Sequence, residues 1–238
     1  MNRKETVNVI RLVDPNVESN CYILFDCRES CAGALVDSQT SSKDCIVIDP
    51  NNFELLEQTF QVWNLKPEYV LLTHGHCDHI SGLNELREHY EVTVVSTTVC
   101  SKEIQNTRDN MSRMMELFLY YKSGERKVES YDSFCCEAAD IHFQDQIQIP
   151  FTNDYIRMKA LPGHTHGSCV ICYRDMIFCG DYLIQEEPVM TRLPGGSEEE
   201  YGHYAKPWLQ SIPDGKIICP GHGNVYLMGE EARLRHDL

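Results

Sequence analysis

The sequence predicts a single α/β domain built from layers of strands and helices. Short β-rich runs alternate with helical stretches along the chain, without an internal repeat and without a linker rich in Pro, Gly or Ser. A length of 238 residues is enough to bury the core of one such domain. Hydrophobic residues make up 42% and charged residues 24% of the sequence, which is ordinary for a globular protein. We therefore expect one domain over residues 1–238.

The strands and helices follow from local patterns. Runs rich in β-branched and other apolar residues predict strands at 7–13, 20–26, 44–49, 68–74, 91–97, 147–151, 155–161, 168–174, 176–181 and 216–221. Little more than Asp175 separates two of these strands, which predicts a tight hairpin there. Helical patterns predict helices at 53–63, 81–90, about 101–121, 197–210 and 229–236.

The segment at about 98–145 is expected to be a helical and loop insertion. Within it, five large side chains recur at helical spacing: Met111, Met114, Met115, Phe118 and Tyr121. We expect a helix that packs this face on the core, with a substrate or partner surface as the less favoured alternative. The polar stretch that follows is expected to be a loop or lid.

Charge and cysteine content bear on partners and compartment. With 36 acidic and 21 basic residues, the formal net charge is −15, which disfavours nucleic acid and acidic membranes and favours a small-molecule substrate. The N-terminal stretch lacks the apolar core of a signal peptide, and no apolar run could span a bilayer. Most of the 12 cysteines lie in apolar runs, and a chain of this length does not need disulfides to fold. We expect free thiols and a cytoplasmic location.

The sharpest local signal is the run Thr73-His74-Gly75-His76-Cys77-Asp78-His79, at the end of a predicted strand. So many imidazoles beside a carboxylate are costly to bury without a charge to neutralise them, and a polar surface loop is the weaker alternative. His74 and His76 can aim at one point, and Asp78 and His79 at a second. Nitrogen and oxygen donors of this kind suit zinc, and also iron or manganese.

Three further polar residues, each flanked by glycine, follow later strands. They are His164 in PGHTHG, Asp181 in CGD and His222 in PGHG. A lone histidine after a strand is usually a surface or capping residue. Side chains delivered from several strand ends, however, converge readily on one edge of a sheet, so the combination predicts one site.

Together the motifs THGHCDH, PGHTHGS, FCGDYL and CPGHG resemble the metallo-β-lactamase-fold hydrolase superfamily, and within it the glyoxalase II-like branch. Further similarity lies at Asn20–Leu24, Val47–Pro50 and Thr191–Ser197, so the resemblance extends from about residue 7 to 230. It implies an αββα sandwich of two mixed β-sheets flanked by helices, with a binuclear metal site along one edge.

The resemblance also implies which residues hold the metals. The first metal would be held by His74, His76 and His164, and the second by Asp78, His79 and His222. Asp181 would bridge the two metals through its two oxygens. A cysteine at position 181 would resemble the true β-lactamases, whereas aspartate resembles the hydrolases of thioesters, esters and phosphoesters.

Four other residues need an interpretation, and three of them have two each. Asp49 could orient a ligand histidine or cap the next helix. His166 could contact the substrate or be an exposed loop residue, and His203 is expected at the surface. Cys77 could face the site, but burial behind it is favoured. None of the four is expected to be a metal ligand.

The implied activity is hydrolysis with water activated by two divalent metal ions, zinc being favoured over iron and manganese. The target would be a thioester or ester-type carbonyl, and Asp78 could orient the nucleophile or pass its proton to the leaving group. Glyoxalase II proper continues into a helical domain that helps bind glutathione, whereas only 16 residues follow His222 here, so glutathione recognition is not expected. The alternatives are a mononuclear iron enzyme of the persulfide dioxygenase type, using His164 and Asp181, and a small-molecule phosphodiesterase.

Overall fold

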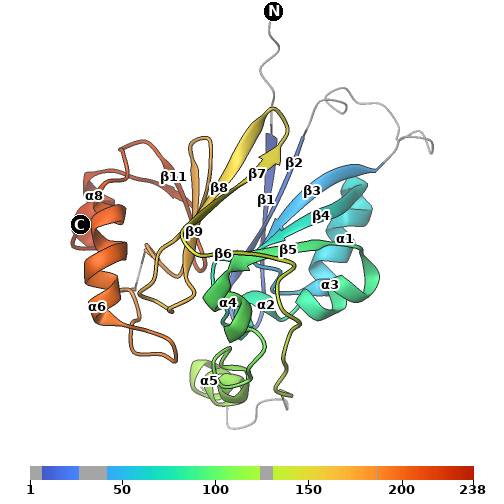
Figure 1. The fold of residues 1–238 in the computed structure, drawn as a ribbon, viewed down its shortest axis with the longest axis horizontal. Coiled ribbons are helices and arrows are strands. Elements are labelled where there is room, and N and C mark those ends of the chain that lie inside the picture. The colour runs from blue at the N-terminus through green and yellow to red at the C-terminus, as the bar shows by residue number, and fades with distance from the viewer. Residues whose placement is uncertain (1–6, 27–41, 124–130, 186) are drawn as a thin grey trace, which may run out of the picture.

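The computed structural model describes residues 7–26, 42–123, 131–185 and 187–238. Two six-stranded sheets face each other, with helices on both outer sides (Figure 1). The strands are β1 (Val7–Val13), β2 (Asn20–Asp26), β3 (Lys43–Ile48), β4 (Leu65–Leu71), β5 (Thr93–Thr97), β6 (Ile141–Phe143), β7 (Gln146–Phe151), β8 (Asp154–Ala160), β9 (Cys169–Tyr173), β10 (Met176–Gly180), β11 (Ile217–Pro220) and β12 (Tyr226–Leu227). The expected αββα sandwich is confirmed.

The helices lie between and after these strands. They are α1 (Phe53–Trp63), α2 (Cys77–Ile80), α3 (Leu83–His89), α4 (Thr98–Glu103), the 3-10 helix η1 (Ser112–Met114), α5 (Met115–Ser123), α6 (Glu198–Glu200), the π-helix η2 (Tyr201–Ala205), α7 (Lys206–Gln210) and α8 (Glu230–Arg235). No helix within the described ranges is both long enough and apolar enough to cross a membrane.

Both sheets are mixed. The first sheet has the order β1-β2-β3-β4-β5-β6, antiparallel up to β3 and parallel from β3 onward. The second sheet has the order β12-β11-β10-β9-β8-β7 and is antiparallel except for the β10–β11 pair. The predicted hairpin at Asp175 is the β9–β10 connection.

Alternation along the strands separates the two sides of each sheet. In β2, Tyr22 and Leu24 belong to the core between the sheets, while Ile23 and Phe25 belong to the core under the outer helices. The ring of Tyr22 meets that of Phe178 from β10 edge-on, with 5.1 Å between centroids. This contact joins the two sheets at the centre of the sandwich.

Helix α1 shows how local sequence sets its own ends. The side chain of Asn52 accepts a hydrogen bond from the N–H of Leu55, and Asn64 ends the helix in the left-handed conformation. Between these caps, Leu56 and Phe60 are buried against the first sheet. The second sheet is covered in the same way by α7 and α8, through Leu209 and Ala232.

The predicted continuous helix over 101–121 is wrong. Helix α4 ends at Glu103, and Met111 adopts the left-handed conformation with φ 64° before η1 and α5 begin. The physical reason is Asn110, whose side chain accepts from the N–H of Ser112 and donates to the carbonyl of Phe134, in competition with helical hydrogen bonds. The segment therefore folds as a turn between short helices.

The expected core face of that helix is wrong for Met114 and Phe118, while Met111 packs, partly buried, against the small cluster that contains Met115. Met115 is buried, but Met114 and Phe118 are 47% and 46% exposed. The side chain of Tyr121 and the central part of the expected loop or lid, residues 124–130, lie outside the described residues. In Figure 1, α5 lies at the lower end of the molecule, apart from the helices that cover the sheets.

Candidate metal centre

The structure brings all seven predicted metal-binding residues together at one edge of the sandwich. Loops after β4, β8, β10 and β11 carry His74 and His76, His164, Asp181 and His222, while Asp78 and His79 lie on α2. Their candidate donor atoms form two groups, each with all atoms within 4.8 Å of one another. The first group is His74, His76, His164 and Asp181, and the second group is Asp78, His79 and His222.

Asp181 lies between the two groups. Its Oδ2 is 3.5 Å from Nε2 of His164 in the first group, and its Oδ1 is 3.2 Å from Nε2 of His79 in the second. The second group is drawn together by Asp78, whose Oδ2 lies 3.1 Å from Nε2 of His222. One carboxylate therefore presents a different oxygen to each donor group.

Three of the imidazole rings are oriented by acceptors at Nδ1. The acceptor is Thr73 Oγ1 for His74 at 3.0 Å, Asp49 Oδ2 for His79 at 3.2 Å and the Met190 carbonyl for His164 at 2.7 Å. A proton held on Nδ1 leaves the lone pair on Nε2, which is the atom turned toward the centre. Backbone and side-chain acceptors thus prepare these rings to bind a cation.

Asp49 accepts hydrogen bonds from both Thr73 and His79 and so links the residue that orients His74 to the ring of His79. Its Oδ1 accepts from the N–H of Thr73 at 2.8 Å, and its Oδ2 accepts from the Thr73 hydroxyl at 2.6 Å and from His79. The expectation that Asp49 orients a histidine is confirmed. The alternative that it caps the next helix is wrong, because Asn52 caps α1.

Buried donor atoms indicate what the site can bind. Among the described residues, the Nε2 atoms of His74 and His76 are buried without a hydrogen-bond partner, while Nε2 of His79 and Oδ1 of Asp181 face each other at 3.2 Å. Unsatisfied polar atoms in a buried position cost about 1–3 kcal/mol each. Cations held by the two donor groups would pair with these atoms, so the donor set fits divalent metal ions.

The protonation states in the first group suit metal binding. Burial lowers the pKa of His74 and of His164, and it lowers the pKa of His76 to about 3. These imidazoles are therefore neutral near pH 7, which is the form that can ligate a metal.

In the second group, the carboxylates and the histidine rings each stabilise the charged form of the other. Burial alone would raise the pKa of Asp78, but His79 and His222 lower it to about 2, and the same two histidines lower that of Asp181. Burial disfavours charge on His79 and His222, yet the facing carboxylates raise the pKa of both rings. Protons on these two rings balance the negative charges of the carboxylates. A divalent cation bound here would displace these protons and balance the charges instead.

Glycines let the strand ends approach one another at the site. A Cβ on Gly221 would collide with Oδ1 of Asp181 and lie 2.7 Å from Cε1 of His79. A Cβ on Gly180, whose φ is +54°, would lie 2.7 Å from Oγ1 of Thr73. The predicted pattern of a polar residue beside glycine thus has a steric cause.

Glu103, a buried residue at the end of α4, was not among the residues predicted from the sequence. Its Oε1 accepts from the N–H of Gly167 and its Oε2 from the hydroxyl of Thr165, both at 3.2 Å. Burial raises the pKa of Glu103 to about 7. These bonds fasten the loop that carries His164 to α4. The local signal was a glutamate between the apolar residues Cys100 and Ile104, on a helix face that the core buries.

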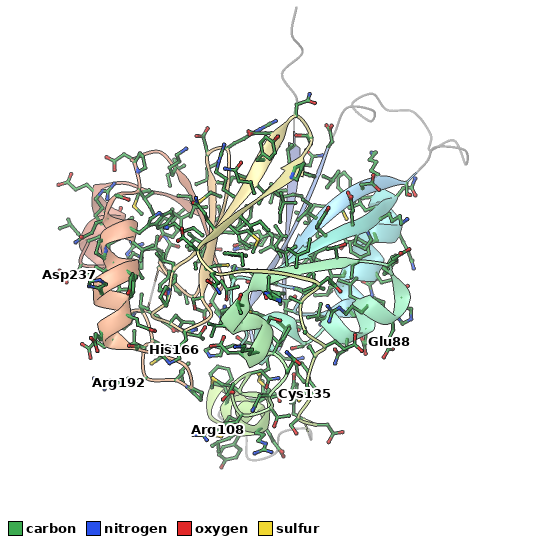
Figure 2. All side chains as sticks on the ribbon, viewed as in Figure 1. Glu88, Arg108, Cys135, His166, Arg192 and Asp237 are labelled. Atoms are coloured by element: carbon green, nitrogen blue, oxygen red, sulfur yellow. The ribbon has the colours of Figure 1, made fainter. Side chains whose placement is uncertain are left out.

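Three other residues fall outside the centre. The side chain of His166 is 52% exposed and lies 2.6 Å from Glu200, on the lower side of Figure 2, and His203 is exposed, as expected. Cys77 is only 2% exposed and belongs to a small apolar cluster with Val17 and Met115. Its favoured interpretation, burial, is confirmed.

A cavity of about 860 Å³ opens onto the centre. Its base includes His76, Asp78, His164, Asp181 and His222. Its lining also includes apolar side chains, among them Met114, Phe118 and Met190. A concave site of this size, with convergent polar groups at its base, is suited to a small-molecule ligand.

Comparison with known proteins identifies the family. Residues 34–222 match the model of the metallo-β-lactamase superfamily. The chain belongs to this superfamily. Among the relatives of this superfamily member, hydroxyacylglutathione hydrolase GloC of Haemophilus influenzae is 24% identical over 220 residues, which cover 91% of each chain. An uncharacterized protein of Mycobacterium tuberculosis is 26% identical over 227 residues, or 90% of each chain.

Solved structures of the metallo-β-lactamase superfamily share the fold of this chain. The BLEG-1 B3 metallo-β-lactamase matches with a TM-score of 0.72 and 20% identity, over 96% of this chain and 97% of its own. TTHA1623, solved in a di-iron-bound form, matches with a TM-score of 0.65 and 21% identity, over 94% and 97%. ETHE1 from Myxococcus xanthus matches with a TM-score of 0.61 and 20% identity, over 95% and 80%. The family expected from the four motifs is confirmed.

Proposed function

We propose that this protein is a metal-dependent hydrolase whose binuclear zinc site activates water for attack on a thioester or ester-type carbonyl. The observation that carries the proposal is the position of Asp181, which turns one oxygen to His164 and the other to His79. A carboxylate shared in this way would bridge two ions. The first ion would be held by His74, His76 and His164, and the second by Asp78, His79 and His222.

Two divalent ions, when bound there, lower the pKa of water and polarise the carbonyl that is attacked. The chain itself would supply proton handling. Asp78 lines the cavity, and its carboxylate would orient the attacking water and accept its proton. The water oxygen joins the carbonyl carbon, the carbon–sulfur bond breaks, and its electron pair leaves with the thiolate. Asp78 would then return the proton to the sulfur, giving a carboxylic acid and a thiol.

Similarity to named relatives supports a thioester substrate. GloC and a Vibrio vulnificus protein that is 29% identical over 138 residues both carry the name hydroxyacylglutathione hydrolase. Aspartate at position 181, where the true β-lactamases would have cysteine, supports the same class. For this chain we propose hydrolysis of a thioester carbonyl, as the names of these relatives indicate for them, but not recognition of glutathione.

The assembled second group favours this function over the mononuclear iron alternative. A single-metal enzyme of the persulfide dioxygenase type would need only His74 or its neighbours, His164 and Asp181. Here Asp78 and His222 also face each other at 3.1 Å, within a buried cluster that adds a second set of donors. Iron remains a candidate for both positions, as does manganese.

The test is metal quantification of protein purified without added metal, followed by assays with thioesters, lactones, phosphodiesters and thiol persulfides. We expect two zinc ions per chain and hydrolysis of thioesters. Asp181→Ala and His76→Ala should lose both metal and turnover, while the exposed His166→Ala should keep both. A single iron ion with oxygen consumption on persulfides would favour the dioxygenase, and turnover of phosphodiesters alone would favour the phosphodiesterase. Full activity in a metal-free Asp181→Ala protein would refute metal catalysis.

We also propose a reducing compartment, the cytoplasm, and no nucleic-acid partner. The ten cysteines that the structure describes are all free, and eight of them are buried. Cys27 and Cys31 lie outside the described residues. Free buried thiols behave as small apolar core residues. The net charge of −15 supports a small-molecule substrate over a phosphate polymer.

A further inference from the structure

Five large apolar side chains line the same cavity as the predicted metal-binding residues. They are four methionines and a phenylalanine, and we call them the methionine wall: Met111, Met114, Met115, Phe118 and Met190. The first four come from η1, α5 and the residue before them, and Met190 comes from the loop after β10. Elements far apart in the sequence thus contribute apolar side chains to the cavity that contains the candidate reaction centre.

Three side chains of the wall are exposed although they lie in a concave site. Met114 is 47%, Phe118 46% and Met190 48% exposed. Clustered exposed apolar groups at a cavity mark a surface that a ligand covers. Methionine is flexible and polarizable, so it adapts to chains of different length and shape.

Charges around the cavity narrow the kind of group that can lie there. Among the lining residues that the structure describes, Glu18 and Glu187 are acidic in addition to Asp78 and Asp181, while Arg11 is basic. The Arg11 guanidinium donates to the carbonyl of Gly223 at 2.6 Å and to the side chain of Asn224 at 3.4 Å, on the side of His222. The five residues of the methionine wall are uncharged, so an acyl group with a carboxylate or phosphate would form no ion pair with them. The same group would also lie in a cavity lined by Glu18 and Glu187.

We propose that the acyl part of the substrate is an uncharged alkyl chain that lies against the methionine wall, so that the enzyme prefers thioesters of medium-length apolar acids. This inference rests on the proposed thioester hydrolysis, because it assigns the two sides of the scissile bond. The carbonyl lies at the metal-binding residues and the alkyl chain extends toward Met114 and Phe118.

The test uses zinc-loaded protein and S-acyl N-acetylcysteamine thioesters whose acyl chains grow stepwise from acetyl to decanoyl. Each methylene buried against the wall should raise kcat/KM about fourfold until the wall is covered. The double variant Met114→Gln, Phe118→Gln should reduce this increase to less than about twofold per methylene, because a polar wall no longer favours burial of the chain. Leu117→Gln is the matched control, since Leu117 is 46% exposed on the same helix but does not line the cavity.

A second measurement separates the inference from the proposed activity. Binding of S-alkyl N-acetylcysteamine thioethers, which cannot be hydrolysed, should tighten with chain length in the wild type and in Leu117→Gln, and not in the double variant. Such binding without any thioester turnover would uphold the apolar subsite and refute the proposed hydrolysis. Chain-length-independent binding in the wild type, or an unchanged dependence in the double variant, would overturn the inference.

Discussion

Asp49 offers the sharpest test of how the metal centre is prepared. Its carboxylate accepts three hydrogen bonds, from the N–H and hydroxyl of Thr73 and from Nδ1 of His79. We consider Asp49→Asn, because asparagine tolerates the left-handed backbone that Asp49 adopts at φ 53°. The new amide has one oxygen and one NH₂ group, so it cannot accept from both sides.

Either orientation of that amide is costly. If its oxygen faces His79, the NH₂ group meets the buried N–H of Thr73, and an unsatisfied donor costs about 1–3 kcal/mol of folding free energy. If the NH₂ group faces His79, that ring must move its proton to Nε2 and can no longer ligate through it. Loss of such an orienting partner weakens metal binding about 10- to 100-fold, or about 1.4–2.7 kcal/mol.

The assay is zinc titration of the metal-free protein against a chromophoric chelator, paired with urea unfolding. We expect zinc binding by the second donor group, which contains His79, to weaken by about 10- to 100-fold, or the free energy of unfolding to fall. Asp140→Asn is the matched control, since its carboxylate also accepts a backbone N–H, from Val94 at 2.8 Å, far from the metal-binding residues. Zinc affinity within about threefold of wild type, with unchanged unfolding, would refute this account of Asp49.

Two further predictions concern Glu103 and Gly221. Because burial raises the pKa of Glu103 to about 7 while its unfolded value stays near 4.5, the folded metal-free protein holds a proton that the unfolded chain loses, so stability falls as pH rises between those values. In Glu103→Gln, the free energy of unfolding should decrease between pH 4.5 and pH 8 by up to about 3 kcal/mol less than in the wild type, as measured by urea unfolding. An identical pH dependence in both proteins would contradict this prediction. Gly221→Ala should lose metal and about 1–3 kcal/mol of stability, since its methyl group would displace Asp181 and His79. Gly202→Ala, where an added Cβ meets nothing within 4 Å, should retain both properties.

Elements whose boundaries depend on local chemistry were predicted well from the sequence. Helix α1 covers the predicted 53–63, because Asn52 and Asn64 cap it from within the same segment. Strands β6 and β12, with 3 and 2 residues, were missed because such short runs show no periodicity and exist only through pairing with β5 and β11.

The candidate site was predicted in its residues but not in its surroundings. Polar side chains beside glycine at strand ends carry a local signature, so His74 or Asp181 can be recognised from the sequence alone. The role of Glu103 depends on its hydrogen bond to Thr165, in a loop distant in the sequence. The position of Met114 depends on the turn at Asn110, whose side chain donates a hydrogen bond to the carbonyl of Phe134. Helical spacing at Met114 and Phe118 was real, but the side chains that it aligned face a cavity and not the core.

The predicted metal-binding residues come from both halves of the sandwich. The first sheet supplies His74, His76, Asp78 and His79, and the second supplies His164, Asp181 and His222. The centre therefore exists only where the two sheets are docked, and an ion bound there acts as a cross-link between them. By thermodynamic linkage, metal at about 100 times its dissociation constant would add about 2.7 kcal/mol to the unfolding free energy. Metal bound there would therefore stabilise the docked pair of sheets as well as supply the proposed chemistry.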